Sequence, residues 1–414
     1  MQRTDVIVLG AGMVGVSAAL HLQQRGRSVV IVDRRGPGEE TSYGNAGLIQ
    51  REGVVPYPFP RDITLMARYA FNQLPEANLH WSALPTIAPW LFRYWRSSTP
   101  EGVAMTARGA RPLVERCIVE HEAIMAEAGL LGIVRRTGYM RVFRTAPALE
   151  EALAKQRRDR ETYGVNFEPL DAAKVADLEP HLKDVVVGGV LMPDPVSVSD
   201  PGAVVKGYAE LFEKRGGKFL QADARTLEEG RDIWVIGTPR GPLIAREVVL
   251  ALGPWSDDIF RPLGYRFPLG IKRGYHQHFT ALGNATLNRP VLDAENGYML
   301  APMTRGIRLT TGAEFARRDA PPTPVQLERV TPRARELFPI DAKAEPQYWL
   351  GNRPCLPDML PIIGRAPRHR GLWLDFGHHH LGFTLGPVSG RLLAEMMTGE
   401  KPFTDPAPYR AERF

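Results

Sequence analysis

The first segment of the chain combines a short apolar run, a glycine-rich turn and a helical pattern. Asp5–Leu9 is an apolar run of strand length. Between Met13 and Arg25 the apolar residues recur at helical spacing, which predicts a helix that ends at Gly26. The β-branched run Ser28–Val32 predicts a second strand. Strand, helix and strand in this order are typical of an α/β fold.

Two later stretches predict different kinds of structure. Ser199–Pro201 places capping residues and a proline at the start of a helix that stops at Gly216, and Lys218–Ala224 predicts a strand. Between Tyr265 and Phe315 apolar and polar residues alternate, with glycines between the runs, which predicts an antiparallel sheet. The pattern therefore indicates an α/β part and a second part with an antiparallel sheet.

Residues 61–165 are rich in helix formers, and aromatic side chains crowd one part of this segment. Core packing in a helical cap is one interpretation. The other is a surface that dips into a membrane, where Trp, Tyr and Arg are favoured at the interface. Arg93 and Arg96 fit either interpretation. The aromatic residues concerned are Trp81, Trp90, Phe92, Tyr94 and Trp95.

Composition excludes several classes of protein. The 414 residues are 44% hydrophobic and 24% charged, as in ordinary globular proteins, and no apolar run approaches the roughly 20 residues of a membrane span. Two cysteines cannot build a disulfide framework or a four-ligand zinc site. The net charge of +6 is spread along the chain, so we expect no nucleic-acid partner. The N-terminus lacks a signal-peptide pattern, so we expect a cytoplasmic protein.

The glycine-rich turn carries the strongest chemical signal. Gly10-Ala-Gly-Met-Val-Gly15 joins the first strand to the helix, and Asp33 ends the second strand. Gly10 permits the tight turn, Gly12 lets the backbone approach a pyrophosphate, and Gly15 lets the helix pack on the strand. Asp33 can accept hydrogen bonds from a ribose diol. This predicts a dinucleotide site and leaves FAD and NAD open, since Arg34 is also compatible with a 2′-phosphate.

A second glycine-rich segment favours FAD. Glu40-Thr-Ser-Tyr-Gly-Asn-Ala-Gly47 offers backbone N–H groups and hydroxyls for a second pass over the pyrophosphate. Flavoproteins commonly have such a loop here, and NAD enzymes lack it.

With these motifs the chain resembles the FAD-dependent D-amino-acid dehydrogenases and glycine oxidases of the D-amino-acid oxidase superfamily. The resemblance implies a Rossmann-type FAD-binding domain (residues 1–60, 195–262 and 350–414) interleaved with an α+β substrate-binding domain (61–194 and 263–349) that carries the antiparallel sheet. Its motifs are Gly10–Gly15 with Asp33, Thr41–Gly47, Val248–Ser256, and the C-terminal set Gly351–Asp358, Pro361–Gly364 and Gly377–Pro387.

The resemblance also implies how FAD is held. FAD is expected to be bound non-covalently. In a sarcosine-oxidising branch the flavin is attached through a cysteine, but the sequence around Cys355 does not match that of the attachment cysteine. The N-terminus of the last helix is expected to face the flavin N1–C2=O region. The residues implied for FAD are Gly10, Ala11, Gly12, Met13, Val14, Gly15, Asp33, Arg34, Thr41, Ser42, Asn45, Ala46, Gly47, Leu48, Ala224, Ala251, Gly253, Trp255, Gly382, Phe383 and Thr384.

For the substrate, Arg353 is the leading candidate. Its planar guanidinium matches a carboxylate, and it aligns with the arginine of the Gly-x-Arg-Pro motif of glycine oxidases; the alternative is a structural ion pair. Tyr275 and Tyr298 are candidates to touch the substrate, or else ordinary residues of the sheet. His380 is expected over the substrate or in a packing role. The side chains of adjacent histidines cannot all face one metal ion, so we expect no metal at His378–His380.

The implied activity is FAD-dependent dehydrogenation of D-amino acids or cyclic D-imino acids, with D-proline or cis-4-hydroxy-D-proline as the preferred examples. The hydride passes from Cα to flavin N5, and no side chain is needed as acid or base. An O2-using oxidase of glycine or sarcosine type and a non-catalytic flavin-binding subunit remain alternatives. The electron acceptor stays open between quinone, dye and O2, and contact with the inner face of the membrane is a further expectation.

Overall fold

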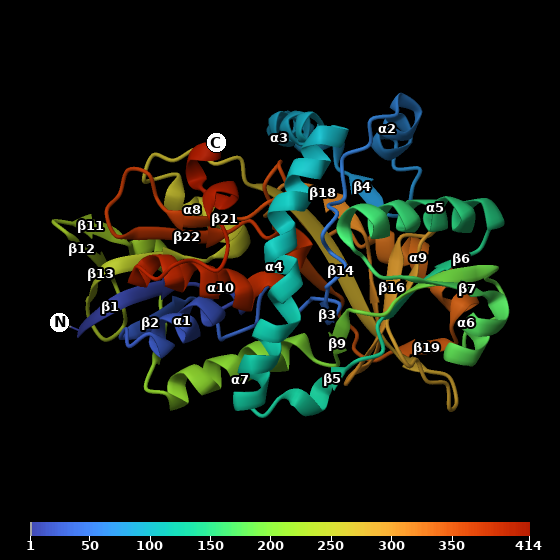
Figure 1. The fold of residues 1–414 in the computed structure, drawn as a ribbon, viewed down its shortest axis with the longest axis horizontal. Helices are drawn as coiled ribbons and strands as arrows, with labels where there is room; N and C mark the ends of the chain where they lie inside the picture. The colour runs from blue at the N-terminus through green and yellow to red at the C-terminus, as the bar shows by residue number, and fades with distance from the viewer. Residues whose placement is uncertain (1) are drawn as a thin grey trace.

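A computed structural model describes residues 2–414. Its first sheet has eight strands with a parallel centre, in the order β10-β2-β1-β13-β12-β11, and β22 and β21 continue from β13 (Figure 1). Strand β1 runs parallel to β2 and β13, as expected for the predicted α/β part. The strands are β1 (Gln2–Leu9), β2 (Val29–Asp33), β10 (Lys218–Gln221), β11 (Glu228–Gly230), β12 (Ile233–Ile236), β13 (Leu243–Leu250), β21 (Ile362–Arg365) and β22 (Leu372–Phe376).

The second sheet has eleven strands in the order β4-β18-β14-β17-β16-β15-β6-β8-β7, with β19 and β20 also paired to β14. The antiparallel pairing of β14, β16 and β17 confirms the alternation predicted for this part of the chain. The strands are β4 (Ala77–Leu79), β6 (Tyr139–Phe143), β7 (Glu168–Asp171), β8 (Gly188–Met192), β14 (Gly270–Ala281), β15 (Val291–Asp293), β16 (Tyr298–Met303), β17 (Gly306–Thr310), β18 (Ala313–Phe315), β19 (Ile340–Lys343) and β20 (Trp349–Cys355). A third, small sheet joins β3 (Leu48–Ile49), β9 (Val196–Val198) and β5 (Val134–Arg135).

Helices cover both parts of the molecule. Helix α1 was predicted to end near Arg25 and ends at Gln24, and α7 begins at Pro201 as predicted. The helices are α1 (Met13–Gln24), α2 (Ile63–Ala70), α3 (Leu84–Ser97), α4 (Pro100–Glu127), α5 (Ala146–Tyr163), α6 (Ala172–Leu178), α7 (Pro201–Lys214), α8 (Asp257–Phe260), α9 (Val325–Leu337) and α10 (Gly382–Thr398).

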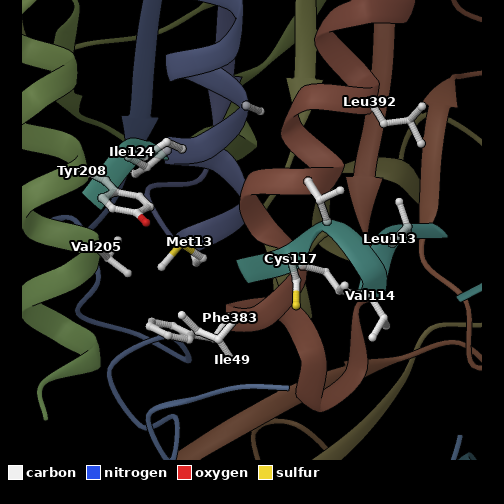
Figure 2. Close-up of a cluster of buried hydrophobic side chains, with 14 of the residues drawn as sticks. Met13, Ile49, Leu113, Val114, Cys117, Ile124, Val205, Tyr208, Phe383 and Leu392 are labelled. Carbon is white, nitrogen blue, oxygen red and sulfur yellow. The ribbon is translucent and has the colours of Figure 1, made fainter. Parts of the chain in front are cut away.

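The long helix α4 belongs to the core of the FAD-binding part, although residues 61–194 were expected in the substrate-binding part. Leu113 and Cys117 of α4 are fully buried in one apolar cluster with Met13 of α1 and Leu392 of α10 (Figure 2). Close packing of α4 against α10 ties the segment after residue 100 to the first sheet. The apolar face of α4 therefore acts as core, and Cys117 is the buried small side chain that its helical position predicted.

Other details differ from the expectation. The segment 61–165 also contains strands, and β6 joins the second sheet beside β15. The strand expected to reach Ala224 ends at Gln221, because Ala224 begins a short 3-10 helix that ends at Thr226. The domain boundary expected at residue 350 lies inside β20, which pairs with β14 of the second sheet.

The aromatic cluster of residues 81–95 is divided between the two interpretations. Trp90 and Tyr94 are buried and Trp95 is half-buried, whereas Trp81 and Phe92 are 53% and 58% exposed. Core packing therefore accounts for Trp90 and Tyr94 and leaves Trp81 and Phe92 on the surface. Within residues 2–414, no helix combines the length and the hydropathy that crossing a bilayer requires.

Candidate active site

A cavity of about 870 Å³ lies between the two sheets. Its wall takes Gly10, Gly12 and Asp33 from the first part and Lys272 and Arg353 from the second. This volume falls in the upper part of the range of about 300–1,000 Å³ for ligand pockets, which suits a dinucleotide together with a small substrate.

The first glycine turn is shaped by close backbone contacts. Gly10 has a φ of 113°, and a Cβ there would lie 2.4 Å from the carbonyl oxygen of Ala251. A Cβ on Gly15 would lie 2.0 Å from the carbonyl oxygen of Gly10. At Gly12 the nearest atom is Ser42 Oγ, at 3.3 Å, so the backbone is open on this side. The N-cap residue of α1 is Gly12, which has no side chain, and the amide of Met13 donates to Ser42 Oγ at 3.0 Å. The N-terminus of the helix meets the cavity as a dinucleotide site requires.

One end of the cavity carries paired charges. Asp33 accepts a hydrogen bond of 2.7 Å from the amide of Ala11. Arg34 forms an ion pair with Glu40 at 3.2 Å and lies over the ring of Trp255. Ala224 lines the cavity here. At this end Arg34 is thus paired with a carboxylate, whereas Asp33 has only backbone amides as partners.

The second glycine-rich segment is held from behind by the second sheet. Thr41 Oγ1 donates to the carbonyl oxygen of Asn352 at 2.9 Å. Gly44 lies directly against Trp349, because a Cβ on this glycine would come within 1.8 Å of the indole ring. Asn45 Oδ1 accepts from the amide of Gly47 at 2.8 Å, which closes the turn.

Arg308 completes this support, and the sequence motifs did not reveal it. Its Nη1 donates to the carbonyl oxygens of Tyr43 (3.1 Å) and Asn45, and its Nε donates to Nε2 of His278 at 2.9 Å. His278 in turn contacts Glu345 through Nδ1 at 2.5 Å. The signal available in the sequence was only the alternation of β17, in which Arg308 looks like any polar strand residue.

The N-terminus of α10 reaches the cavity through Gly382 and Phe383. The helix has no side-chain cap, so its first N–H groups are free for a ligand. Thr384 lies behind the wall, where its hydroxyl accepts from the amide of Gln50 at 3.1 Å. His121 holds the carbonyl oxygen of Phe383 at 2.8 Å through Nε2.

Arg353 lies in the cavity wall without a carboxylate partner. Its Nη1 donates to the carbonyl oxygen of Gly312 at 2.9 Å, and its Nη2 donates to that of Thr311 at 3.3 Å. Among residues 2–414, no acidic oxygen lies within 4.0 Å of this guanidinium. Burial lowers the pKa of Arg353 from its ordinary value. The structural ion pair considered above is therefore not formed.

His380 lies beside this arginine. Burial, and then the charges of Arg353 and Lys272, lower the pKa of His380 to about 3, so the imidazole is neutral at physiological pH. Its ring centroid is 5.2 Å from that of Tyr57. His378 points elsewhere, with Nε2 at 3.4 Å from Asp375. Within residues 2–414, no cluster of three or more His, Cys, Asp or Glu is arranged to hold a metal.

The two candidate tyrosines have different positions. Tyr275 lines the cavity, but its hydroxyl is fully engaged: it donates to Glu314 at 2.9 Å and accepts from Arg273 and from the amide of Thr323. Tyr298 lies outside the cavity wall, in the apolar core under α9, and its hydroxyl donates to the carbonyl oxygen of Arg333. Of the two interpretations of Tyr298, the structure favours the ordinary residue of the sheet, because its strand turns this side chain to the face away from the cavity.

The residues expected to hold FAD also divide into those that line the cavity and those that lie behind its wall. Four of them lie behind the wall as supports: Ala11, Gly15, Gly47 and Thr384. The others reach the cavity: Gly10, Gly12, Met13, Val14, Asp33, Arg34, Thr41, Ser42, Asn45, Ala46, Leu48, Ala224, Ala251, Gly253, Trp255, Gly382 and Phe383.

Sequence reasoning missed several polar residues of the wall, among them Lys272, Tyr57 and Arg141. Lys272 of β14 donates to the hydroxyl of Tyr94 at 2.9 Å. Tyr57 comes from the proline-rich segment after β3, and Arg141 comes from β6. The alternation of Tyr139–Phe143 was the available signal for Arg141, and the helical composition around it concealed that strand.

Comparisons with known proteins decide the family. A family model described as FAD dependent oxidoreductase matches residues 5–396.

The chain belongs to this family.

This confirms the resemblance drawn from the four motifs and the choice of FAD over NAD. Two curated proteins of similar length match nearly the whole chain. A D-amino-acid oxidase of Bradyrhizobium diazoefficiens is 30% identical and covers 99% of this chain and 98% of its own. A D-amino acid dehydrogenase of Cereibacter sphaeroides is 30% identical over 99% of this chain and 95% of its own.

Solved structures confirm the α/β fold with its second, antiparallel sheet. Glycine oxidase from Geobacillus kaustophilus superposes with a TM-score of 0.78 at 21% identity, covering 100% of both chains. L-proline dehydrogenase from P. horikoshii gives a TM-score of 0.72 at 18% identity, over 100% of this chain and 98% of its own.

The cavity fits the FAD that the family requires. It offers the open backbone at Gly12, two helix N-termini whose N-cap residues form no side-chain cap, and the space between them and Arg353. N–H groups at helix N-termini are suited to phosphates and to an anionic flavin. The polypeptide thus provides N–H groups for the phosphates and the flavin of FAD, and a cavity with room for the whole cofactor.

Proposed function

We propose that this protein oxidises D-amino acids or cyclic D-imino acids, with bound FAD as the electron acceptor. The observation that carries the proposal is Arg353, a half-buried guanidinium in the cavity wall whose partners are only backbone carbonyls. A partly desolvated cation without an anion is unfavourable, so a ligand carboxylate would supply the missing charge. The fork of Arg353 suits bidentate binding of an α-carboxylate.

In this proposal the side chains orient the substrate. Arg353 holds the carboxylate, neutral His380 adds a hydrogen-bonding group without a second positive charge, and the ring of Tyr275 bounds the site. FAD supplies the two-electron acceptor when bound. A substrate that enters as the free amine needs no protein base, and fixed orientation is the main contribution of the chain. The product is an imino acid, which hydrolyses or, if cyclic, persists.

The division of labour along the chain is part of the proposal. Residues 1–60, 195–262 and 356–414 would hold FAD, and the second sheet would hold the substrate. The wall residues near Gly12, Ser42 and Gly382 would contact the cofactor, with the remaining cavity-lining candidates as reported above. A cytoplasmic location also belongs to the proposal, and cell fractionation tests it.

Anaerobic reduction of the bound flavin tests the activity. The holoenzyme is mixed with D- and L-alanine, glycine, sarcosine, D-proline and cis-4-hydroxy-D-proline, and loss of the flavin absorbance is followed. We expect bleaching by D-amino or D-imino acids and not by the L-enantiomers. Bleaching by glycine and sarcosine alone would favour the amine oxidase, and no bleaching by any compound would leave a non-catalytic flavin protein. Turnover with O2 alone, compared with a quinone or dye, then identifies the acceptor.

We also propose that the protein touches a membrane surface through α2 and α3, which both lie at the top of the view in Figure 1. Ile63, Phe71 and Phe92 are 81%, 66% and 58% exposed there. Neither helix contains an acidic residue, and both contain arginines. Exposed apolar and cationic side chains together suit an anionic lipid surface.

Co-sedimentation with vesicles tests this contact. We expect the holoenzyme to bind vesicles of phosphatidylcholine with phosphatidylglycerol and to lose binding when Ile63 and Phe92 are replaced by Ser. Leu282→Ser is the matched control, because Leu282 is 62% exposed and lies away from α2 and α3. Equal binding by the control and the double variant would exclude these helices as the contact surface.

A further inference from the structure

Four arginines line the cavity, and they differ in their partners. Arg34 pairs with Glu40 at 3.2 Å, and Arg225 pairs with Asp223 at 2.6 Å. Arg353 contacts only carbonyl oxygens, and Arg141 has no hydrogen bond or ion pair with any residue of 2–414. Two guanidinium groups of one cavity therefore lack an anion.

Arg141 is fixed in the wall by its strand. It occupies the middle of β6, with Tyr139 and Phe143 on the same face and Met140 buried in the core on the other face. On the neighbouring strand β15, Leu292 is its register partner. The Nε atom of Arg141 is buried without a partner. The alternation of a strand thus directs this charge into the cavity and keeps it from the solvent face.

Arg141 and Arg353 share one compartment. Tyr57 projects into the cavity and lies 5.2 Å from His380, centroid to centroid. Desolvation raises the pKa of Tyr57, and the charge of Arg141 opposes this rise; desolvation and then the charge of Arg353 lower the pKa of His380. Each arginine therefore acts on one member of the same ring pair.

Glu52 forms no ion pair with Arg141. No carboxylate oxygen lies within 4.0 Å of the Arg141 guanidinium among residues 2–414. Glu52 Oε1 accepts from Gln50 Nε2 at 2.9 Å, and its Oε2 is buried without a partner. Burial raises the pKa of Glu52 to about 7, and the charge of Arg141 opposes this rise, so the carboxyl is mostly protonated only below pH 7.

We propose that Arg141 is a second anion site of the active-site cavity and that the substrate is a D-amino acid with a second carboxylate. The inference rests on the proposed function, in which Arg353 takes the α-carboxylate. Both arginines line the same cavity, and the ring pair of Tyr57 and His380 belongs to the wall that they share. A distal carboxylate on a longer side chain reaches farther from the α-carboxylate, so we expect a lower KM for D-2-aminoadipate and D-glutamate than for D-aspartate.

Matched acid and amide substrates test the second site. KM is measured in the holoenzyme for D-glutamate and D-glutamine, and for D-alanine as a substrate without a distal group. We expect KM for D-glutamate to be at least about tenfold below that for D-glutamine, as a charge-assisted hydrogen bond provides. In Arg141→Met this difference should disappear while KM for D-alanine stays the same. Arg158→Met, at an exposed arginine of α5, is the control and should preserve the difference.

A binding measurement separates this proposal from the proposed function. The change of the flavin spectrum is titrated with glutarate and with butyrate, in the wild type and in Arg141→Met. We expect tighter binding of glutarate in the wild type only, even if no D-amino acid reduces the flavin. Equal affinities in the wild type, or an equal loss for both ligands in the variant, would overturn the second anion site. Absence of flavin reduction with selective glutarate binding would overturn only the oxidase activity.

Discussion

Nη1 of Arg308 lies 3.1 Å from the carbonyl oxygen of Tyr43. The guanidinium comes from β17 of the second sheet, while Tyr43 belongs to the glycine-rich segment that follows β2 in the first part of the chain. The same Nη1 also contacts the carbonyl oxygen of Asn45. By holding two carbonyls from behind, Arg308 directs the opposite side of this segment, with Ser42 and Ala46, into the cavity.

Replacement of Arg308 by Met should weaken FAD binding. Two buried carbonyls would lose their donor, and hydrogen bonds to a charged group are worth about 1.5–3 kcal/mol each. We expect the Kd for FAD to rise about tenfold or more, measured by fluorescence titration of the apoprotein. Activity at saturating FAD should fall much less. Arg305→Met is the control, since Arg305 is exposed, and an equal effect of both variants would contradict the role of Arg308.

Gly12→Val should abolish retention of FAD. The backbone of Gly12 meets only Ser42 Oγ within 4 Å, so valine methyl groups would occupy the open side and displace this hydroxyl from the amide of Met13. The flavin content after purification, read from the visible spectrum, checks the prediction. Gly132→Val is the matched control, since Gly132 is exposed, its backbone is not left-handed and nothing lies within 4 Å of a Cβ there. A yellow Gly12→Val protein would remove this turn from the cofactor site.

FAD should be released from the denatured protein. Cys355 lines the cavity, but it is buried against Trp90 and Tyr94, and burial raises the pKa of its thiol, which disfavours the reactive thiolate. Acid precipitation should leave the flavin in the supernatant and the pellet colourless. Flavin that stays on the polypeptide would show a covalent bond, and Cys355→Ser would then identify its site.

The local pattern predicted the parts of the fold that depend on short-range order. Helix α1 and the strands on either side of it follow from periodicity and from the glycines of the turn. The antiparallel sheet followed from alternation. Strand β6 was missed because its five residues lie between long helices, and a strand of this length is stabilised by its neighbours β8 and β15 more than by its own sequence.

The site was predicted where a motif specifies it and missed where tertiary packing creates it. The Gly-x-Arg-Pro motif identified Arg353, whereas Arg308 and Arg141 come from strands without a motif. Tyr298 is the opposite case, a residue that was a candidate for the site but lies outside the cavity. Alternation placed it in the sheet but could not tell which face meets the cavity, and a shift of one residue reverses the face. Only the pairing of the strands supplies that information.

Replacement of Arg353 by Met should raise KM for the substrate by about one to two decades, because charge-assisted hydrogen bonds of about 1.5–3 kcal/mol are lost. Arg353→Lys keeps the charge without the fork and should have a smaller effect. The flavin content should stay near normal, since the three acceptors of Arg353 are backbone carbonyls of the sheet. Steady-state kinetics checks this. An unchanged KM in a flavin-containing Arg353→Met protein would remove this residue from the substrate site.

The stability of the protein should depend on the protonation of Glu52. Burial raises the pKa of this carboxyl from the ordinary 4.5 to about 7, so the folded state keeps a proton that the unfolded state releases between these values. The contribution of Glu52 to stability is therefore greatest below pH 4.5 and declines as the pH rises to about 7.

The comparison with Glu52→Gln isolates this contribution, because all other titrations are common to both proteins. The pKa values of three groups that face Glu52 are raised above their ordinary values, so these groups stay neutral in this range: Tyr57, Cys117 and Tyr139. We expect the free energy of unfolding of Glu52→Gln, relative to the wild type, to increase between pH 5 and pH 8, measured by urea denaturation. A difference that does not change with pH would mean that Glu52 is already ionised at pH 5. Glu52 would then be a permanent negative charge near Arg141, and the second anion site would lose its support.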